Sequence, residues 1–263
     1  MGQEIDDVKR EVAIGTRLLA EFGLATGILA SLGHVSMRVP NDPELFVVKG
    51  RGYPMDALAV MRPEQMVVVD MDGNLVDGPR DAWQCNEVKM HSCILRERPD
   101  IQSVTHVHPR FTIVMGLLGI KMQAMCNEGQ QLTRAGIPVF PHSRLILTEE
   151  DGMGVVKDMG DSSAVMLRGH GAATTGSSVE SSVMTMLQLE EQSRQNYYAY
   201  SMVGADYKGI PEADQDEFAA GQRTMREQPH LKGPITASRL QPGGPGQPGG
   251  VWSYYSSLVS ADF

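Results

Sequence analysis

Two short apolar runs that lead into histidines constrain the fold of this chain more than any other feature. The first, Ser103-Val-Thr-His-Val-His-Pro109, is rich in β-branched residues, which is typical of a strand. Residues i and i+2 of a strand point to the same face, so His106 and His108 are expected to project together. The second run, Ala164-Val-Met-Leu167, leads to His170 between two glycines. A fold that uses these histidines as a group must bring two strand ends together.

Strand-like and helix-like segments alternate along the rest of the chain. Residues 5–30 carry apolar residues at helical spacing, with Gly23 and Gly27 as a break. Further strands are expected at 46–49, 66–70 and 138–140, and further helices at 87–98, at 111–118 and from a capping box at Ser177-Ser-Val-Glu180 to about Gly204. This alternation predicts an α/β fold with a central sheet.

The composition is that of an ordinary globular protein. The 263 residues are 41% hydrophobic and 21% charged, which suits one large domain with a buried core. A net charge of −9 disfavours nucleic acid and anionic membranes as partners. The three cysteines have no CxxC spacing, and neither a signal pattern nor a membrane-spanning apolar run is present. We therefore expect a cytoplasmic protein without disulfides.

The composition changes after residue 240, which divides the chain into a domain of residues 1–240 and a tail of residues 241–263. The tail opens with a Pro/Gly-rich run typical of a flexible or polyproline-like linker. It continues with Val251-Trp-Ser-Tyr-Tyr-Ser256, which is too aromatic to be left in water. This segment either docks on its own subunit or forms a flap over an active site, its own or a neighbour's. We favour the flap, with Tyr254 and Tyr255 facing a substrate.

The three histidines match the ligands that a divalent metal ion takes in proteins. For His106 and His108 alone, the alternative is a pair of strand histidines satisfied by backbone groups. The glycines beside His170 favour a site, because they let the backbone approach a ligand closely. Three neutral imidazoles leave positions open for water or substrate. We expect one divalent ion per subunit (Zn, Mn, Co or Fe(II)) and no organic cofactor.

Glu87 is the candidate carboxylate for this site. It begins the predicted helix 87–98, which Asn86 would cap, and His91 lies one turn later on the same face. A carboxylate near the ion would act as a further ligand or as an acid/base group. The alternative is an ordinary carboxylate that stabilises the helix N-terminus.

Several motifs occur together in a characteristic order: Gly33-His-Val-Ser36, Asn86-Glu87, His91, Arg98-Pro-Asp100, His106-Val-His108-Pro109 and Arg168-Gly-His-Gly171. In this order and spacing, residues 8–208 resemble the class II aldolase/adducin family. The resemblance implies a three-layer α/β/α fold with a largely antiparallel central sheet, usually assembled as a homotetramer with active sites between subunits. It also implies that His106, His108 and His170 hold a divalent metal, with Glu87 as metal neighbour and acid/base.

The chain departs from the sugar-phosphate enzymes of this family where they bind phosphate. Their Gly-Asn-x-Ser turn has His34 in place of Asn, their Ser-Gly segment corresponds to Lys49-Gly-Arg-Gly52, and their Ser-Ser pair to Cys85-Asn86. Small hydroxyl donors are thus lost. Cations are gained at Arg38, Lys49 and Arg51, and arginine binds carboxylates as well as phosphates. The alternative for each cation is a side chain that faces solvent.

This pattern is similar to the branch of the family that decarboxylates hydroxylated aromatic or heteroaromatic acids, such as hydroxy-pyridine dicarboxylates and dihydroxyphthalates. The resemblance implies a metal-dependent carbon–carbon lyase acting on a small carboxylated molecule. Glu87 would donate the proton that replaces CO2, and His34 or Arg51 would hold a carboxylate. Substrate contacts are expected from Ser36, Arg38, Lys49, Asn86, Tyr254 and Tyr255, and His91, His142, Asn127 and Glu128 are further neighbours to test.

Two alternatives remain at this point. The first is a class II aldolase or epimerase acting on a sugar phosphate or a hydroxy-carbonyl substrate, which would use the same metal. The second is a non-catalytic, adducin-like oligomeric module. Relatives of that kind generally lack the metal histidines, which this chain has.

Overall fold

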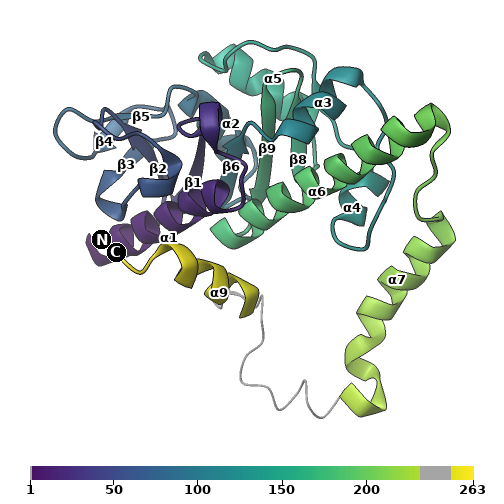
Figure 1. Cartoon of the computed structure of the whole chain (residues 1–263). Coiled ribbons are helices and arrows are strands. Elements are labelled where there is room, and N and C mark those ends of the chain that lie inside the picture. The colour runs from purple at the N-terminus through teal and green to yellow at the C-terminus, as the bar shows by residue number, and fades with distance from the viewer. Residues whose placement is uncertain (1, 232–249) are drawn as a thin grey trace.

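A mostly antiparallel sheet organises the computed structural model, which describes residues 2–231 and 250–263 (Figure 1). The strands are β1 (Gly33–Val39), β2 (Asp42–Arg51), β3 (Met66–Asp70), β4 (Leu75–Asp77), β5 (Trp83–Gln84), β6 (Ser103–Val107), β7 (Val139–Phe140), β8 (Ala164–Leu167) and β9 (Gly171–Gly176). The helices are α1 (Gly2–Glu21), α2 (Val88–Glu97), α3 (Arg110–Leu118), α4 (Gln130–Arg134), α5 (Glu149–Met159), α6 (Val179–Val203), α7 (Glu212–Thr224) and α9 (Gly250–Val259). No described helix is long and apolar enough to cross a membrane.

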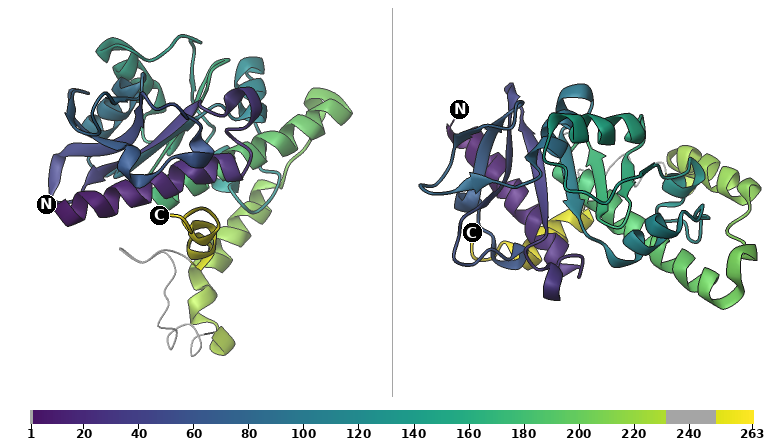
Figure 2. Two further views of the ribbon diagram at one scale, coloured as in Figure 1. Left: turned by 60° about the vertical axis from the view of Figure 1, so that its left-hand side comes forward. Right: turned by 90° about the horizontal axis from the view of Figure 1, so that it is seen from above.

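The sheet runs in the order β4-β3-β2-β1-β6-β9-β8-β7, and β5 pairs with β2 beside this path. Only the β7–β8 pair is parallel among the described strands. Helices α1 and α6 cover one face, and α2 and α5 cover the other (Figures 1 and 2). The expected three-layer α/β/α fold with a largely antiparallel sheet is therefore confirmed.

Apolar side chains point alternately to the two faces of the sheet along β2 and β3, so helices must cover both faces. In β2, Val47 belongs to the core beneath α1 and α6, whereas Phe46 and Val48 belong to the core beneath α2 and α5. In β3, Val68 belongs to the first of these cores and Val67 to the second. Because neighbouring strand residues point to opposite faces, these continuous apolar runs bury both faces of the sheet.

One edge of the sheet gathers the ends of the central strands. Gly33 at the start of β1 pairs with Val107 at the end of β6, and Val107 pairs with Ala172 near the start of β9. The turn from β8 to β9 closes at the same edge, where Leu167 pairs with Gly171. The antiparallel register thus brings together the start of β1, the end of β6 and the turn from β8 to β9, which are the segments that carry the histidines.

Several local expectations differ from the structure. The segment from Gly33 is not a turn but the beginning of β1, and β6 ends at Val107, so His108 follows the strand rather than belonging to it. Glu87, not Asn86, occupies the position before α2. The capping box of α6 is formed by Ser178 and Ser181, one residue beyond the predicted pair.

The aromatic tail forms α9, which packs on α1 of its own chain (Figure 2). Trp252 is buried there, and the ring of Tyr255 lies 4.6 Å from that of Phe22. Beyond the helix, Arg17 Nη1 pairs with Asp262 Oδ1 at 2.5 Å. The segment therefore docks on its own subunit, so a flap over the chain's own site is wrong, and a flap over a neighbour's site stays a prediction. The predicted linker lies largely outside the described residues.

Candidate metal centre and active site

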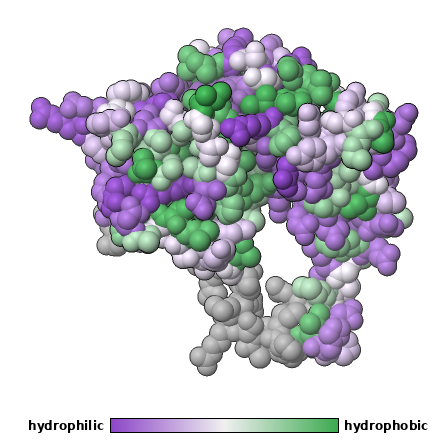
Figure 3. All heavy atoms as spheres, in the orientation of Figure 1, coloured by the Kyte–Doolittle hydropathy of each residue, from purple (hydrophilic) through white to green (hydrophobic). Residues whose placement is uncertain are grey.

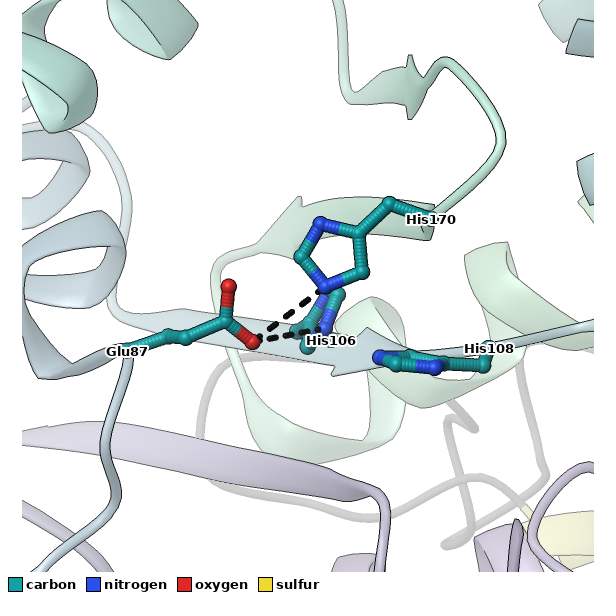
Figure 4. A group of neighbouring side chains, drawn as sticks. All are labelled: Glu87, His106, His108 and His170. Atoms are coloured by element: carbon teal, nitrogen blue, oxygen red, sulfur yellow. Dashed lines mark ion pairs between the residues drawn. The ribbon is translucent and has the colours of Figure 1, made fainter. Parts of the chain in front are cut away.

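Glu87 and three histidines converge at the sheet edge (Figure 4). Glu87 Oε2 lies 3.5 Å from His106 Nε2 and 3.4 Å from His170 Nε2. The rings of His106, His108 and His170 have centroids 4.8–5.2 Å apart. One donor atom from each of the four side chains lies within 4.8 Å of the others. All four are buried except His108, which is partly buried. We call this set the metal-ligand group.

Local structure places each of these side chains. In β6, Ser103 and Thr105 point to α6, where both hydroxyls meet Ser182, so His106 must point to the opposite face. His108 follows two residues later, just beyond the strand, and its ring points toward the same group (Figure 4). Gly171 cannot carry a side chain, because a Cβ there would lie 2.4 Å from the carbonyl oxygen of Val107. Because the two backbones approach so closely, the ring of His170 lies next to that of His106.

The donor atoms are unpartnered in the way that metal ligands are. His106 Nδ1 donates to the carbonyl of Ala172 at 2.9 Å, so Nε2 carries the lone pair. That nitrogen and both ring nitrogens of His170 are buried without a hydrogen-bond partner in the described structure. Ligand atoms about 2.1 Å from one tetrahedral ion lie about 3.4 Å apart, which matches the separations from Glu87 Oε2. The residues present therefore fit a divalent cation.

The protonation of the group agrees with this fit. Burial raises the pKa of Glu87, but positive charge on the side of His106 and His170 outweighs burial and holds the pKa well below its usual value, and a bound cation would supply that charge between neutral imidazoles. Its other oxygen, Oε1, accepts a hydrogen bond from the Ile146 backbone at 2.9 Å. Burial, reinforced by the two neighbouring histidines, lowers the pKa of His108 to about 3. A carboxylate and neutral imidazoles are the forms that bind metal.

A second histidine pair lies beside the first group. His34 is the cross-strand partner of His106, and their ring centroids are 5.0 Å apart. His34 Nδ1 lies 2.6 Å from His91 Nε2, and His91 Nδ1 lies 2.6 Å from Ser36 Oγ. Cys85 completes a buried cluster with the two rings. We call Ser36, His91 and His34 the hydrogen-bonded chain.

Two predicted cations lie at the end of β2, at the same sheet edge. Lys49 Nζ pairs with Asp56 Oδ1, and Arg51 Nη2 lies 3.0 Å from Asp56 Oδ2. Lys49 is buried, and its charge acts on the pKa of both His34 and Cys85. Two cations share one carboxylate, so this corner keeps a net positive charge beside the metal-ligand group.

Other predicted residues are placed elsewhere. Arg38 donates to the backbone carbonyls of Pro43, Leu95 and Ile101, so it joins β1 to the end of α2 and is not free to bind a substrate. Ser36 is buried behind His91 and does not face a substrate either. Tyr254 and Tyr255 lie on α9, where Tyr255 packs against Phe22 and Tyr254 is exposed.

Three further candidates can also be placed. Asn86 has an exposed side chain in the turn next to Glu87. His142 is exposed and packs against Phe140, with ring centroids 5.1 Å apart. Asn127 and Glu128 line a cavity of about 620 Å³ between α4, α6 and α7, whose lining includes none of the histidines.

Two contributors were missed by sequence reasoning. Asp56 lies in the loop after β2, and only the folded loop shows that it pairs with both cations. The Ile146 amide holds Glu87 from a segment 59 residues away and leaves no pattern in the sequence. His91 was seen only as a neighbour of Glu87. Its pairing with His34 required the correct assignment of β1.

Comparison with known proteins agrees with this geometry. Residues 10–197 match the family described as the Class II Aldolase and Adducin N-terminal domain. The chain belongs to this family, as its motifs predicted.

Two curated relatives are both described as 3,4-dihydroxyphthalate decarboxylase. The one from Arthrobacter keyseri is 32% identical over 80% of this chain and 85% of its own length. The one from Rhodococcus jostii is also 32% identical, over 80% of this chain and 90% of its own length. The fold is similar to that of L-fuculose 1-phosphate aldolase from Glaciozyma antarctica, with a TM-score of 0.71 at 18% identity, covering 97% of this chain and 89% of that one. The chain is thus a member of an enzyme family that includes decarboxylases and aldolases.

Proposed function

We propose that this protein is a divalent-metal-dependent decarboxylase of a hydroxylated aromatic or heteroaromatic carboxylate. The observation that carries the proposal is the metal-ligand group, with its unpartnered nitrogens beside a corner of net positive charge. The name that the two relatives share supports the choice of reaction. A small substrate with two anionic groups could span the ion and the cations.

Glu87, His106, His108 and His170 would hold the ion. When bound, a divalent ion would stabilise the negative charge that develops on the ring oxygen of the substrate. Glu87 is a carboxylate at neutral pH, so it would accept the proton of the ring hydroxyl and deliver it to the ring carbon that carries the leaving group. The C–C bond electrons then return to the ring as CO2 leaves, and the ring oxygen regains a proton from water.

Arg51 and Lys49 would bind a carboxylate of the substrate that is not lost. An arginine fork matches the two oxygens of a carboxylate, and the burial of Lys49 strengthens its attraction for an anion. Asp56 occupies these cations in the structure and would have to share them with the substrate.

We further propose that the protein works as a homo-oligomer. Large apolar residues are exposed near the ends of α3 and α6, among them Leu117, Leu118, Tyr198 and Met202. Hydrophobic residues gather over the same part of the surface in Figure 3. Patches of this kind are typical of surfaces that another subunit covers. Light scattering during size exclusion would measure the number of subunits.

A substrate screen tests the proposed reaction. Metal-loaded protein would be incubated with ortho-hydroxylated aromatic mono- and dicarboxylates and, separately, with sugar phosphates. We expect CO2 release from an aromatic dicarboxylate and no cleavage of sugar phosphates. Cleavage of a sugar phosphate without CO2 release would instead identify an aldolase. Metal-replete protein inactive on both classes would favour a non-catalytic module.

A further inference from the structure

The hydrogen-bonded chain of Ser36, His91 and His34 has no role in the metal-ligand group. All three side chains are buried, His91 and Ser36 completely. His91 uses both ring nitrogens within the protein, one toward each neighbour, at 2.6 Å. A fully buried imidazole with both nitrogens engaged is held in one orientation.

A second metal site does not explain this cluster. His34, Cys85 and His91 bring their donor atoms within 4.8 Å of one another. However, the 2.6 Å between His34 Nδ1 and His91 Nε2 is the length of a hydrogen bond. Two ligands of one tetrahedral ion would lie about 3.4 Å apart. A proton, not a metal ion, therefore lies between these rings.

The direction of these hydrogen bonds follows from Ser36. Its hydroxyl is buried, and His91 Nδ1 is the one acceptor that it has in the parts of the chain that the structure describes. If the hydroxyl donates, His91 Nδ1 is unprotonated and Nε2 carries the hydrogen. His91 Nε2 then donates to His34 Nδ1, which leaves the hydrogen of His34 on Nε2. In the reverse direction, the hydroxyl hydrogen of Ser36 would be buried without an acceptor, at a cost of about 1–3 kcal/mol.

We propose that Ser36 and His91 are positioning residues that hold His34 in the tautomer with its hydrogen on Nε2, so that His34 donates a hydrogen bond to the substrate. His34 Nε2 has no partner among the described residues, and the ring lies next to His106. The site then offers an N–H donor beside the acceptor Glu87. The substrate contact rests on the proposed function, whereas the tautomer does not.

This assignment makes His34 a neutral donor to an anionic group. His34 Nδ1 accepts the hydrogen bond from His91, which a doubly protonated ring could not do. A neutral imidazole donor can stabilise a carboxylate or a developing oxyanion without adding another charge beside the metal. Glu87, in contrast, can only accept until it takes a proton.

Nitrogen NMR tests the tautomer directly. Zinc-loaded protein labelled with 15N-histidine would be compared with His34→Gln to assign the His34 signals. We expect a protonated Nε2 and an unprotonated Nδ1 for His34. A hydrogen on Nδ1, or a doubly protonated ring, would overturn the proposal. This readout needs no substrate, so it stands even if the proposed reaction is wrong.

Variants of His91 test the functional consequence. His91→Phe keeps the ring shape but removes both nitrogens, and should lower kcat/KM about 10-fold to 100-fold with the metal content unchanged. His91→Gln keeps an N–H near the Nε2 position and should restore most of this loss. Ser36→Ala is a milder change that should give His34 a mixture of tautomers. If Ser36→Ala and His91→Phe both keep the wild-type tautomer and kcat/KM, the chain does not position His34.

Discussion

Two neighbouring groups of histidines use the same side chain in opposite ways. In the metal-ligand group, buried ring nitrogens of His106 and His170 have no hydrogen-bond partner and face a carboxylate oxygen at 3.4–3.5 Å. In the hydrogen-bonded chain, His34 and His91 satisfy each other at 2.6 Å. The longer N···O separations leave room for a cation, whereas at 2.6 Å the lone pair between the two rings is already used by a hydrogen bond.

This contrast teaches that a count of nearby donors does not identify a metal site. Both groups bring at least three candidate donor atoms within 4.8 Å of one another. The two groups differ in whether the lone pairs of the ring nitrogens already accept a hydrogen bond. A buried nitrogen without a partner destabilises the folded protein, and a bound metal ion removes that destabilisation. Substitutions in the two groups should therefore differ in their effect on bound metal.

The largest effect is expected from the metal-ligand group. His170→Asn should reduce bound metal to a small fraction of one ion per subunit and lower turnover about 10³-fold or more, because several kcal/mol of charge stabilisation are lost. Elemental analysis and CO2 release measure the two quantities. His142→Asn is the matched control, since His142 is exposed outside both groups and should change neither. Full turnover after complete metal removal by a chelator would sink the assignment.

Glu87→Gln separates metal binding from proton transfer within the same group. The single glutamine oxygen can keep the hydrogen bond from the Ile146 amide, and His106, His108 and His170 remain to hold the ion. We expect metal to remain bound and kcat to fall about 10²-fold to 10³-fold, because the amide cannot carry the proton. Metal content and kcat are measured together. Near-normal kcat would remove Glu87 from the acid/base role.

The cations beside both groups should control substrate affinity. Arg51→Met should raise KM for a dicarboxylate about 10-fold to 100-fold, in line with about 1.5–3 kcal/mol for a hydrogen bond to a charged group. Turnover at saturation should change much less. Arg134→Met is the control, because Arg134 pairs with Asp216 on the surface and not with this site. An unchanged KM would mean that Arg51 serves only to hold Asp56.

The metal-ligand group was predictable from sequence, whereas the hydrogen-bonded chain was not. His106 and His108 are two residues apart in a strand-like run, and His170 lies between glycines, so the sequence pattern singled these residues out and the family resemblance strengthened the choice. The pairing of His34 with His91 joins positions 57 apart, and the segment from Gly33 was taken for a turn. His34 lies on β1 and His91 on α2, so the packing of this helix against the sheet decides the contact, and neither segment alone encodes it.

The tail shows a similar limit of sequence reasoning. Its aromatic composition correctly indicated burial, but two surfaces could provide it. Trp252 and Tyr255 meet α1, and Asp262 finds Arg17, through contacts that depend on the folded surface of the domain. Docking on the chain's own domain could therefore be recognised only once the position of α1 was known, and a flap over a neighbour's site stays a prediction.

The smallest effect is expected from Cys85, and it tests the contrast most directly. If His34, Cys85 and His91 formed a second metal site, Cys85→Ala would lower the bound metal by up to one ion per subunit. Because the two rings are joined by a hydrogen bond, we expect metal content to stay the same and stability to fall by about 1 kcal/mol from the lost side-chain packing. Elemental analysis and urea unfolding measure these changes. Loss of an ion while the metal-ligand group stays intact would show that both groups of histidines bind metal.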